Sequence, residues 1–415
     1  MLKNIQLFFI WLAILMAFPF SISNAYELPA KPIISICTVI LLGFSLLYIF
    51  KSRLNKVVII MLLVQIFTAI TFIIIHMDSA YVNFSLQLII VLIIFILLEN
   101  GLYIQFCKQL LGFVSVMAVF SVIIFFLCLV FNVAPLNEFT NPDGRPGYNF
   151  IITFTNVYFD VGAFKIIRPS GFFDEPGTLS FYLIIGTLLN DLLFQYKRIR
   201  IVLLVCGIFT LSLAFYALLI LYLCFRYKKR YLSKIVLATF IVVLISTFAI
   251  SSLDEEKQTL LYGYTFGRIE NIFDDKSKSD DTYFQGDNRS DLIENSFFAI
   301  RDSPIIGQGL SYRTNTSSVI YGKFVGANPL SLFAIHGLFG GVIFSLHLFY
   351  YLWVCFKTRR FNLEIKSAII LALLILQRPD YVGGILPYIN ILILLYATKQ
   401  HKLSNTPVYN YNSGI

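Results

Sequence analysis

Residues 57–75 read VVIIMLLVQIFTAITFIII, a run of nineteen residues without a charged side chain. An α-helix of about 20 residues crosses the roughly 30 Å of hydrocarbon in a bilayer. Ten further apolar stretches, most of them near this length, occur at 5–23, 33–50, 84–98, 110–133, 177–195, 201–225, 235–252, 330–355, 367–376 and 383–397. The sequence therefore predicts an all-α protein that crosses a membrane many times.

The overall composition agrees with this fold class. Of 415 residues, 58% are hydrophobic and only 13% are charged, whereas soluble domains carry about 25% charged residues. A soluble enzyme and a disordered chain are therefore excluded. All six cysteines lie in or beside apolar stretches, so neither a disulfide framework nor a zinc site is predicted. The N-terminal run can be a cleaved signal peptide or a retained first helix, and its length favours the retained helix.

The basic residues predict the orientation of the chain. Short cytoplasmic connections are enriched in Lys and Arg, and such clusters occur at 51–56, 197–200, 226–234, 357–360 and 399–402. All five lie on one side of the membrane only if residues 201–225 enter and return as two short helices, with a turn near residues 212–214. Such short helices must be shielded by protein. We therefore expect about twelve membrane helices, with both chain ends in the cytoplasm.

This topology divides the chain into six regions. They are N-terminal transmembrane helices (1–133), a first periplasmic loop (134–175), central transmembrane helices that include the short pair (176–252), a second periplasmic loop (253–328), C-terminal transmembrane helices (329–398) and a cytoplasmic tail (399–415). The net charge of +9 is then an orientation signal. The basic residues are scattered over short loops, so no nucleic-acid partner is expected.

Ionisable side chains are scarce within the apolar stretches, where His336 and His347 are the main exceptions. Ion-coupled transporters place charged residues at bilayer depth and often contain inverted repeats. No such repeat is visible here. The sequence therefore argues against transport and predicts that any polar chemistry lies at the outer surface.

The first outer loop ends in Arg168-Pro-Ser-Gly-Phe-Phe-Asp-Glu-Pro176, directly before an apolar helix. Proline suits the first helical position, and Glu175 before it can cap the helix. Two interpretations remain open. Arg168 and Glu175 can form a surface ion pair beside a rigid turn, or Arg168 and the positive helix N-terminus together can bind an anion.

The second outer loop contains a predicted amphipathic helix near 290–302, with Ile293, Phe297 and Ile300 on one face. Arg289 precedes this helix, and Arg301 lies in its last turn. Arginine binds phosphate groups in a bidentate fashion. A diphosphate carried by a membrane lipid is therefore a natural ligand for the arginines of the two loops.

The amphipathic helix is followed by Gly307-Gln-Gly309, Arg313 and Asn328-Pro329. The two glycines indicate a turn, since the lysine of a phosphate-binding loop is missing. Asn328 and Pro329 predict a capped start for the next membrane helix. His336 lies inside that helix, either as a packed core residue or as a general base for a sugar hydroxyl.

These motifs resemble those of a known enzyme family. The string Arg168-Pro-Ser-Gly-Phe-Phe-Asp-Glu-Pro-Gly-Thr-Leu-Ser-Phe-Tyr-Leu is similar to the signature of bacterial O-antigen and capsular polysaccharide polymerases of the Wzy type. The later run of Arg289, Pro304-Ile-Ile-Gly307-Gln-Gly309, Asn328, Gly337 and Gly341 is similar to a pattern that these polymerases share with O-antigen ligases. Outside 168–341 the resemblance is limited to hydropathy and helix count.

The resemblance implies a GT-C-like fold and a metal-independent glycosyltransferase without a cofactor. Its substrate would be an undecaprenyl-diphosphate-linked oligosaccharide, polymerised at the periplasmic face of the inner membrane during lipopolysaccharide or capsule synthesis. A chain-length regulator protein is the further partner implied. A fixed pair of arginines, Arg168 and Arg289, would stabilise the leaving diphosphate. Arg301, Arg313 and Asn328 complete the expected substrate-binding set.

One departure separates the chain from the ligases. Many relatives carry a histidine directly before the asparagine that matches Asn328, but this chain has Ala327 there. Glu175 is therefore the better candidate for the base, unless His336 substitutes from deeper in the helix. Two alternatives remain: an O-antigen ligase that transfers glycan to lipid A-core, and a polysaccharide flippase or exporter, which should line its cavity with more charge.

Overall fold

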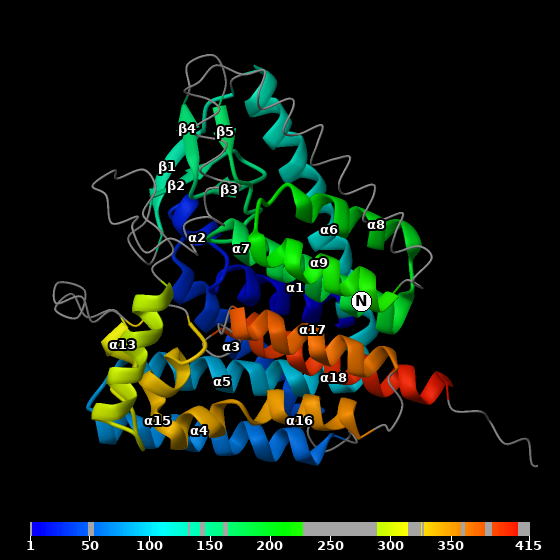
Figure 1. Ribbon diagram of the computed structural model, residues 1–415. Coiled ribbons are helices and arrows are strands. Elements are labelled where there is room, and N and C mark those ends of the chain that lie inside the picture. Colours follow the sequence, from blue (N-terminus) through cyan, green and yellow to red (C-terminus); the bar gives the residue numbers. More distant parts are fainter. Residues whose placement is uncertain are drawn as a thin grey trace, which may run out of the picture.

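The computed structural model describes residues 2–48, 54–131, 133–141, 146–160, 165–226, 289–313, 325, 328–357, 362–377 and 384–405. Helices dominate, and they lie side by side in a bundle (Figure 1). The N-terminal half contains α1 (Leu2–Leu15), α2 (Ile22–Ala25), α3 (Ala30–Leu46), α4 (Lys56–His76), α5 (Ala80–Leu97), a π-helical turn η1 (Leu98–Leu102) and α6 (Tyr103–Phe131). The predicted segment at 235–252 and most of the second outer loop lie outside the described residues.

The remaining described helices complete the bundle. They are α7 (Pro176–Leu189) with the π-helical turn η2 (Asn190–Phe194), α8 (Lys197–Ile208), α9 (Leu213–Arg226), α13 (Arg289–Asp302), the 3-10 turn η3 (Leu310–Arg313), α15 (Ser331–Phe344), α16 (Leu346–Phe356), α17 (Leu363–Gln377) and α18 (Ile385–Asn405). The predicted boundary at Pro176 agrees with the start of α7. The helix α18 continues to Asn405, and the division of the chain into membrane and loop regions stays a prediction.

The first outer loop corrects the all-α prediction. It contains a three-stranded antiparallel sheet of β1 (Asn137–Thr140), β2 (Pro146–Asn149) and β3 (Phe154–Thr155), and a hairpin of β4 (Tyr158–Asp160) and β5 (Lys165–Ile167). Phe, Tyr and Thr favour strands because they pack on a pleated, half-buried surface. The loop is therefore a small β layer placed over one end of the bundle (Figure 1).

Three described helical stretches are long and apolar enough to cross a membrane: Lys56–His76, Ala80–Phe131 and Pro176–Phe194. The second stretch is kinked at Asn100 and Gly101, whose backbone angles are not helical. A fourth span results if α15 and α16, which meet at a bend of 45°, are taken as one. The chain is therefore a helical membrane protein, whereas the expected count of about twelve helices stays a prediction.

The turn predicted within residues 201–225 is present. The helix α8 ends at Ile208 and α9 begins at Leu213, and Leu211 between them adopts a left-handed backbone with φ of 50°. The start of α8 and the end of α9 meet at one carboxylate, because Arg200 and Tyr222 both bind Asp191. The two helices therefore run out and back as a hairpin beside α7.

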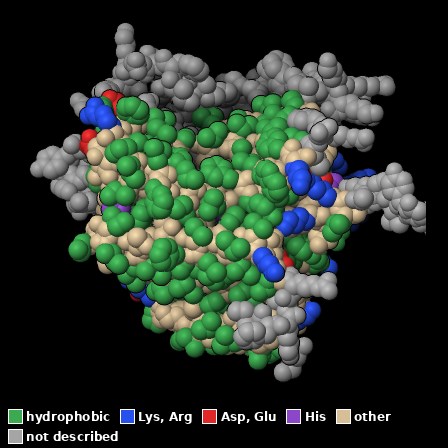
Figure 2. All heavy atoms as spheres, turned by 90° about the horizontal axis from the view of Figure 1, so that it is seen from below, with side chains coloured by type: hydrophobic (Ala, Val, Ile, Leu, Met, Phe, Trp, Pro, Cys, Tyr) green, Lys and Arg blue, Asp and Glu red, His purple; other side chains and the backbone are tan. Residues whose placement is uncertain are grey.

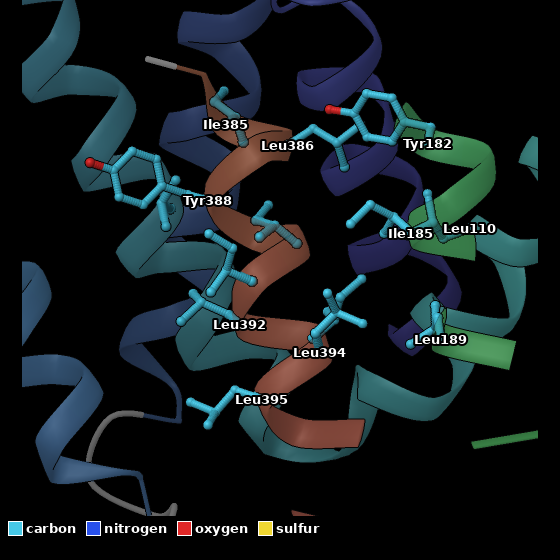
Figure 3. Packing of buried hydrophobic residues seen from close by; sticks show 14 of the residues in the cluster. Leu110, Tyr182, Ile185, Leu189, Ile385, Leu386, Tyr388, Leu392, Leu394 and Leu395 are labelled. Atoms are coloured by element: carbon cyan, nitrogen blue, oxygen red, sulfur yellow. The ribbon is translucent and has the colours of Figure 1, made fainter. Parts of the chain in front are cut away.

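The core of the bundle is apolar and continuous. Figure 3 shows leucine, isoleucine and tyrosine side chains of α18 facing those of α6 and α7, among them Leu110, Tyr182, Ile185 and Leu386. The outer surface is apolar as well. Phe67 and Ile74 on α4 keep 72% and 70% of their surface exposed, and the face seen in Figure 2 is largely hydrophobic. Such a surface suits lipid contact.

Described residues beside three of the predicted basic segments lie together at one end of the bundle, here called the basic end. Lys366 donates to the carbonyl of Phe225, and Lys402 donates to the carbonyl of Val354. At the same end His401 pairs with Glu364. The opposite end, called the loop end, carries the β layer, α2 and α13 (Figure 1).

Candidate active site

Arg168 lies at the loop end, directly after β5, and only 8% of its surface is exposed. Its Nε donates to the carbonyl of Thr210 at 3.3 Å, and one Nη donates to the carbonyl of Leu211 at 2.9 Å. These carbonyls belong to the turn between α8 and α9, where the helix leaves main-chain acceptors without helical partners. Arg168 therefore joins the first outer loop to the tip of the hairpin.

The start of α7 follows the predicted pattern. Pro176 occupies the first turn, and Glu175 is the N-cap residue with an extended backbone, but its side chain makes no capping hydrogen bond. Instead the buried Asp174 accepts a hydrogen bond from the Thr178 hydroxyl at 2.6 Å. The sequence analysis did not single out Asp174. A carboxylate followed four residues later by threonine was the available signal.

The loop that carries this helix start is held by residues 19–21, which connect α1 to α2. The amide of Asp174 donates to the carbonyl of Pro19 at 3.1 Å, and the ring of Phe173 stacks on Phe20 with centroids 4.7 Å apart. Ser21 donates to the buried amide oxygen of Asn141 at 2.8 Å. The segment directly before the half-buried Glu175 is therefore fixed in position at the loop end.

The predicted amphipathic helix is present as α13, and small side chains form its buried face. Ile293 and Phe297 are exposed, whereas Ser296 and Ala299 are buried. The small side chains allow α13 to approach α15 closely, and Ala299 packs there with Val325 and Ala334. Of the three apolar residues of the predicted stripe, Ile293 and Phe297 are therefore exposed, and Ile300 is half-buried and packs against the Ala299 cluster.

Asn328 connects α13 to α15. Its amide nitrogen donates to the Ser296 hydroxyl at 2.7 Å and to the carbonyl of Leu292 at 3.2 Å, and its amide oxygen accepts from the backbone N–H of Leu330 at 2.9 Å. The predicted capped start is shifted, because α15 begins at Ser331 and its N-cap is Leu330. Asn328 forms a turn ahead of the helix instead.

The other predicted arginines lie along the second outer loop. Arg289 opens α13 and Arg313 closes η3, and their side chains lie outside the described part. Arg301 is exposed in the last turn of α13. Its guanidinium lies 5.2 Å from the centre of the Phe298 ring and 4.0 Å from the Asp302 carboxylate.

The segment after α13 that contains Gly307 and Gly309 forms main-chain hydrogen bonds with α15 at the point where that helix is interrupted. Gly337 interrupts that helix with φ of 65° and ψ of −179°, and residues 304–309 pair with the break. Gln308 and Gly309 donate to the carbonyls of Ala334 and Ile335, while Leu338 donates to that of Pro304. A Cβ on Gly307 would lie 2.3 Å from the nitrogen of Gly337. Gly307 and Gly337 therefore allow the main chain of residues 304–309 to contact the main chain of α15. This confirms the predicted turn at Gly307–Gly309.

His336 lies just before this break and is buried. Its Nδ1 lies 2.8 Å from the Tyr81 hydroxyl. The rings of Phe84 and Phe344 surround it, with centroids 5.8 and 4.7 Å away. This is the packed core position that the sequence analysis weighed against a general base. His347 lies deeper, where its Nδ1 accepts from Gln65 at 3.3 Å.

A polar cavity of about 300 Å³, which the sequence analysis missed, lies at the turn between α4 and α5. His76 and Asp78 contribute from this turn, and Gln308, Ser311 and Tyr312 contribute from the segment after α13. The signal available in the sequence was His76-Met-Asp78 at the outer end of an apolar run.

Asp78 anchors η3 to this turn. Its Oδ1 accepts from the Ser311 hydroxyl at 2.6 Å and from the amide of Ala80 at 2.9 Å, and its Oδ2 accepts from the amide of Ser311 at 2.7 Å. Burial alone would raise the pKa of the Asp78 carboxyl, but the hydrogen bonds from Ser311 and Ala80 favour the ionised form, and the pKa is lowered. The carboxylate is therefore ionised at neutral pH.

No group of three or more His, Cys, Asp or Glu side chains suited to a metal ion occurs within the described residues. The candidate polar residues lie at three places of the loop end. Asp174 and Glu175 lie at the start of α7, Arg168 binds the tip of the α8–α9 hairpin, and His76 and Asp78 lie beside the segment after α13.

Comparison with known proteins gives one result. Residues 201–345, about a third of the chain, match the model of a family described as O-antigen ligase. No curated protein and no solved structure matches the chain. The matched stretch includes Arg289, Asn328 and the Gly307–Gly337 contact, and leaves Arg168 and Glu175 outside. It supports a glycosyl-transferring protein of the O-antigen ligase/polymerase superfamily, without distinguishing ligase from polymerase.

Proposed function

We propose that this chain is an O-antigen or capsular polysaccharide polymerase, which joins undecaprenyl-diphosphate-linked oligosaccharides at the periplasmic face of the inner membrane. The observation that carries the proposal is the family match over 201–345, which ends within a helical membrane bundle. Polymerase is preferred over ligase because Ala327 occupies the position of the ligase histidine and because the 168–176 motif is polymerase-like.

In this proposal Arg168 and Arg289 hold the diphosphate of the donor. The leaving group gains negative charge as the glycosidic bond breaks, and guanidinium groups near a helix N-terminus stabilise it. No metal ion or cofactor is invoked. Arg168 suits this role because it is fixed in place by the carbonyls of Thr210 and Leu211, so little reorganisation is needed when the donor binds.

The acceptor is a sugar hydroxyl, and Glu175 is the proposed base. It is the N-cap residue of α7 and follows the segment in which Phe173 stacks on Phe20. His336 is the less favoured base, since aromatic rings enclose it and Tyr81 binds its Nδ1. Asn328 contributes by fixing α13 against α15. Arg301 at the end of α13 and Arg313 at the end of η3 are proposed to bind the glycan.

A deletion strain tests the function directly. Loss of a polymerase should leave lipid A-core with a single repeat unit, whereas loss of a ligase should leave core with none. We expect the single-repeat band, and the same band for Arg168→Ala, Arg289→Ala and Glu175→Gln at unchanged membrane protein level. Arg198→Ala at the basic end is the matched control and should retain long glycan. Core without any repeat unit would count against the polymerase.

The same proposal fixes the orientation, with the loop end in the periplasm and the basic end in the cytoplasm. A cysteine at exposed Glu138 on β1 should react with an impermeant thiol reagent in intact spheroplasts. A cysteine at exposed Lys357 should react only after lysis. The reverse pattern would invert the topology and exclude a periplasmic reaction.

A further inference from the structure

The cavity between the α4–α5 turn and the segment 308–312 has no role in the function proposed so far. It is open to the loop end, and its volume of about 300 Å³ is at the lower end of the range for small-ligand sites. Polar side chains from two distant parts of the chain converge on it, with Asp78 from the turn and Gln308 from the later segment. Such convergence is typical of a site that orients a polar ligand.

His76 presents a hydrogen-bond acceptor at this cavity. Its Nε2 lies 3.1 Å from the carbonyl oxygen of Ile306, and a carbonyl can only accept, so Nε2 carries the proton. In the neutral ring Nδ1 is then an unprotonated acceptor. The ring is fixed from its side by Tyr81, on which it stacks with centroids 5.5 Å apart.

Asp78 presents a second acceptor next to the first. Three hydrogen bonds, two from Ser311 and one from Ala80, occupy the carboxylate, which offers about four lone-pair positions. Gly309 keeps space open between the two acceptors. A Cβ at this residue would lie 3.3 Å from Nδ1 of His76 and 3.5 Å from Oδ2 of Asp78.

We propose that this cavity binds a sugar residue of the glycan through its hydroxyl groups, with Nδ1 of His76 and Oδ2 of Asp78 as the acceptors. This assignment rests on the proposed function, which supplies a saccharide at the loop end. Hydroxyl groups donate to both acceptors, whereas a phosphate would be repelled by the ionised Asp78. The cavity is therefore a saccharide subsite separate from the arginines that hold the diphosphate.

The test uses the full chain in lipid nanodiscs and the free repeat-unit oligosaccharide, released from the host glycan without lipid or diphosphate. Binding is followed by saturation-transfer NMR. His76→Phe keeps the stacking ring but removes the acceptor, and should weaken binding about tenfold. His76→Gln restores an acceptor oxygen and should recover part of the affinity. Asp78→Asn should weaken binding at least as much as His76→Phe.

Thr71→Val is the matched control, because this hydroxyl lies on the same helix and bonds only to the carbonyl of Phe67 among the described groups. It should bind the oligosaccharide as the unaltered protein does, and inorganic phosphate should not compete. Unaltered binding in His76→Phe, or no binding to the parent protein, would overturn the subsite. A normal glycan ladder in the deletion strain would instead remove the proposed function, so the two failures are distinguishable.

Discussion

The two ends of the α8–α9 hairpin are both held by a buried arginine, but in different ways. At the basic end Arg200 pairs with the carboxylate of Asp191, which also accepts from the Tyr222 hydroxyl at 2.6 Å. At the loop end Arg168 donates to the carbonyls of Thr210 and Leu211. The contact at the basic end joins two opposite charges across the start of α8, whereas the contacts at the loop end join a guanidinium to main-chain carbonyls. The ion pair therefore ties α8 and α9 to the turn η2, and Arg168 ties the first outer loop to the hairpin tip.

The substitution with the largest expected effect on the stability of the protein lies at the basic end. Asp191→Ala leaves Arg200 buried without its carboxylate and removes the acceptor of Tyr222. Breaking one side of a buried ion pair costs about 3–5 kcal/mol, so the purified variant should unfold at a clearly lower temperature.

A double variant controls for this loss of stability. Asp191→Leu with Arg200→Met removes both charges at once, and should recover much of the lost stability. If Asp191→Ala melts with the parent protein, the ion pair does not hold the hairpin and the contrast between its two ends disappears.

At the loop end the expected change in stability is smaller and the change in activity is larger. Arg168→Ala removes two hydrogen bonds from a charged donor, and should lower the free energy of unfolding by about 1–3 kcal/mol. Long glycan should nevertheless be lost at normal protein levels, because the charge that meets the diphosphate is gone. Arg168→Lys keeps the charge but cannot reach both carbonyls, so its glycan output should be intermediate. Long glycan from Arg168→Ala would refute the anion site.

This contrast also shows how much the sequence could predict. The hairpin was predictable, because two basic clusters 26 residues apart had to share one side of the membrane. The start of α7 was predictable from Pro176, since proline fits only a few helical positions. Both inferences depend on local chemistry or on a global charge rule.

What was not predictable depends on contacts between distant segments. The carbonyls that bind Arg168 lie more than 40 residues away, and His76 reaches the carbonyl of Ile306 across 230 residues. The sequence around Arg168 and around His76 contains no pattern that indicates these distant partners. The buried face of α13 depends on such a contact as well, because Asn328 bonds to the Ser296 hydroxyl and holds the small-residue face of the helix against α15.

The smallest effect concerns a neutral contact that links α7 to the hairpin tip. The Ser180 hydroxyl donates to the carbonyl of Gly177 at 2.7 Å and lies 3.3 Å from the Ser212 hydroxyl. Ser180→Ala should cost about 0.5–1 kcal/mol and leave glycan length unchanged, because no charge is altered. Ser115→Ala on α6, whose hydroxyl bonds to the Leu111 carbonyl of its own helix, should cost less. Shortened glycan from Ser180→Ala in a stable protein would mean that the position of the tip, rather than the charge of Arg168, limits the reaction.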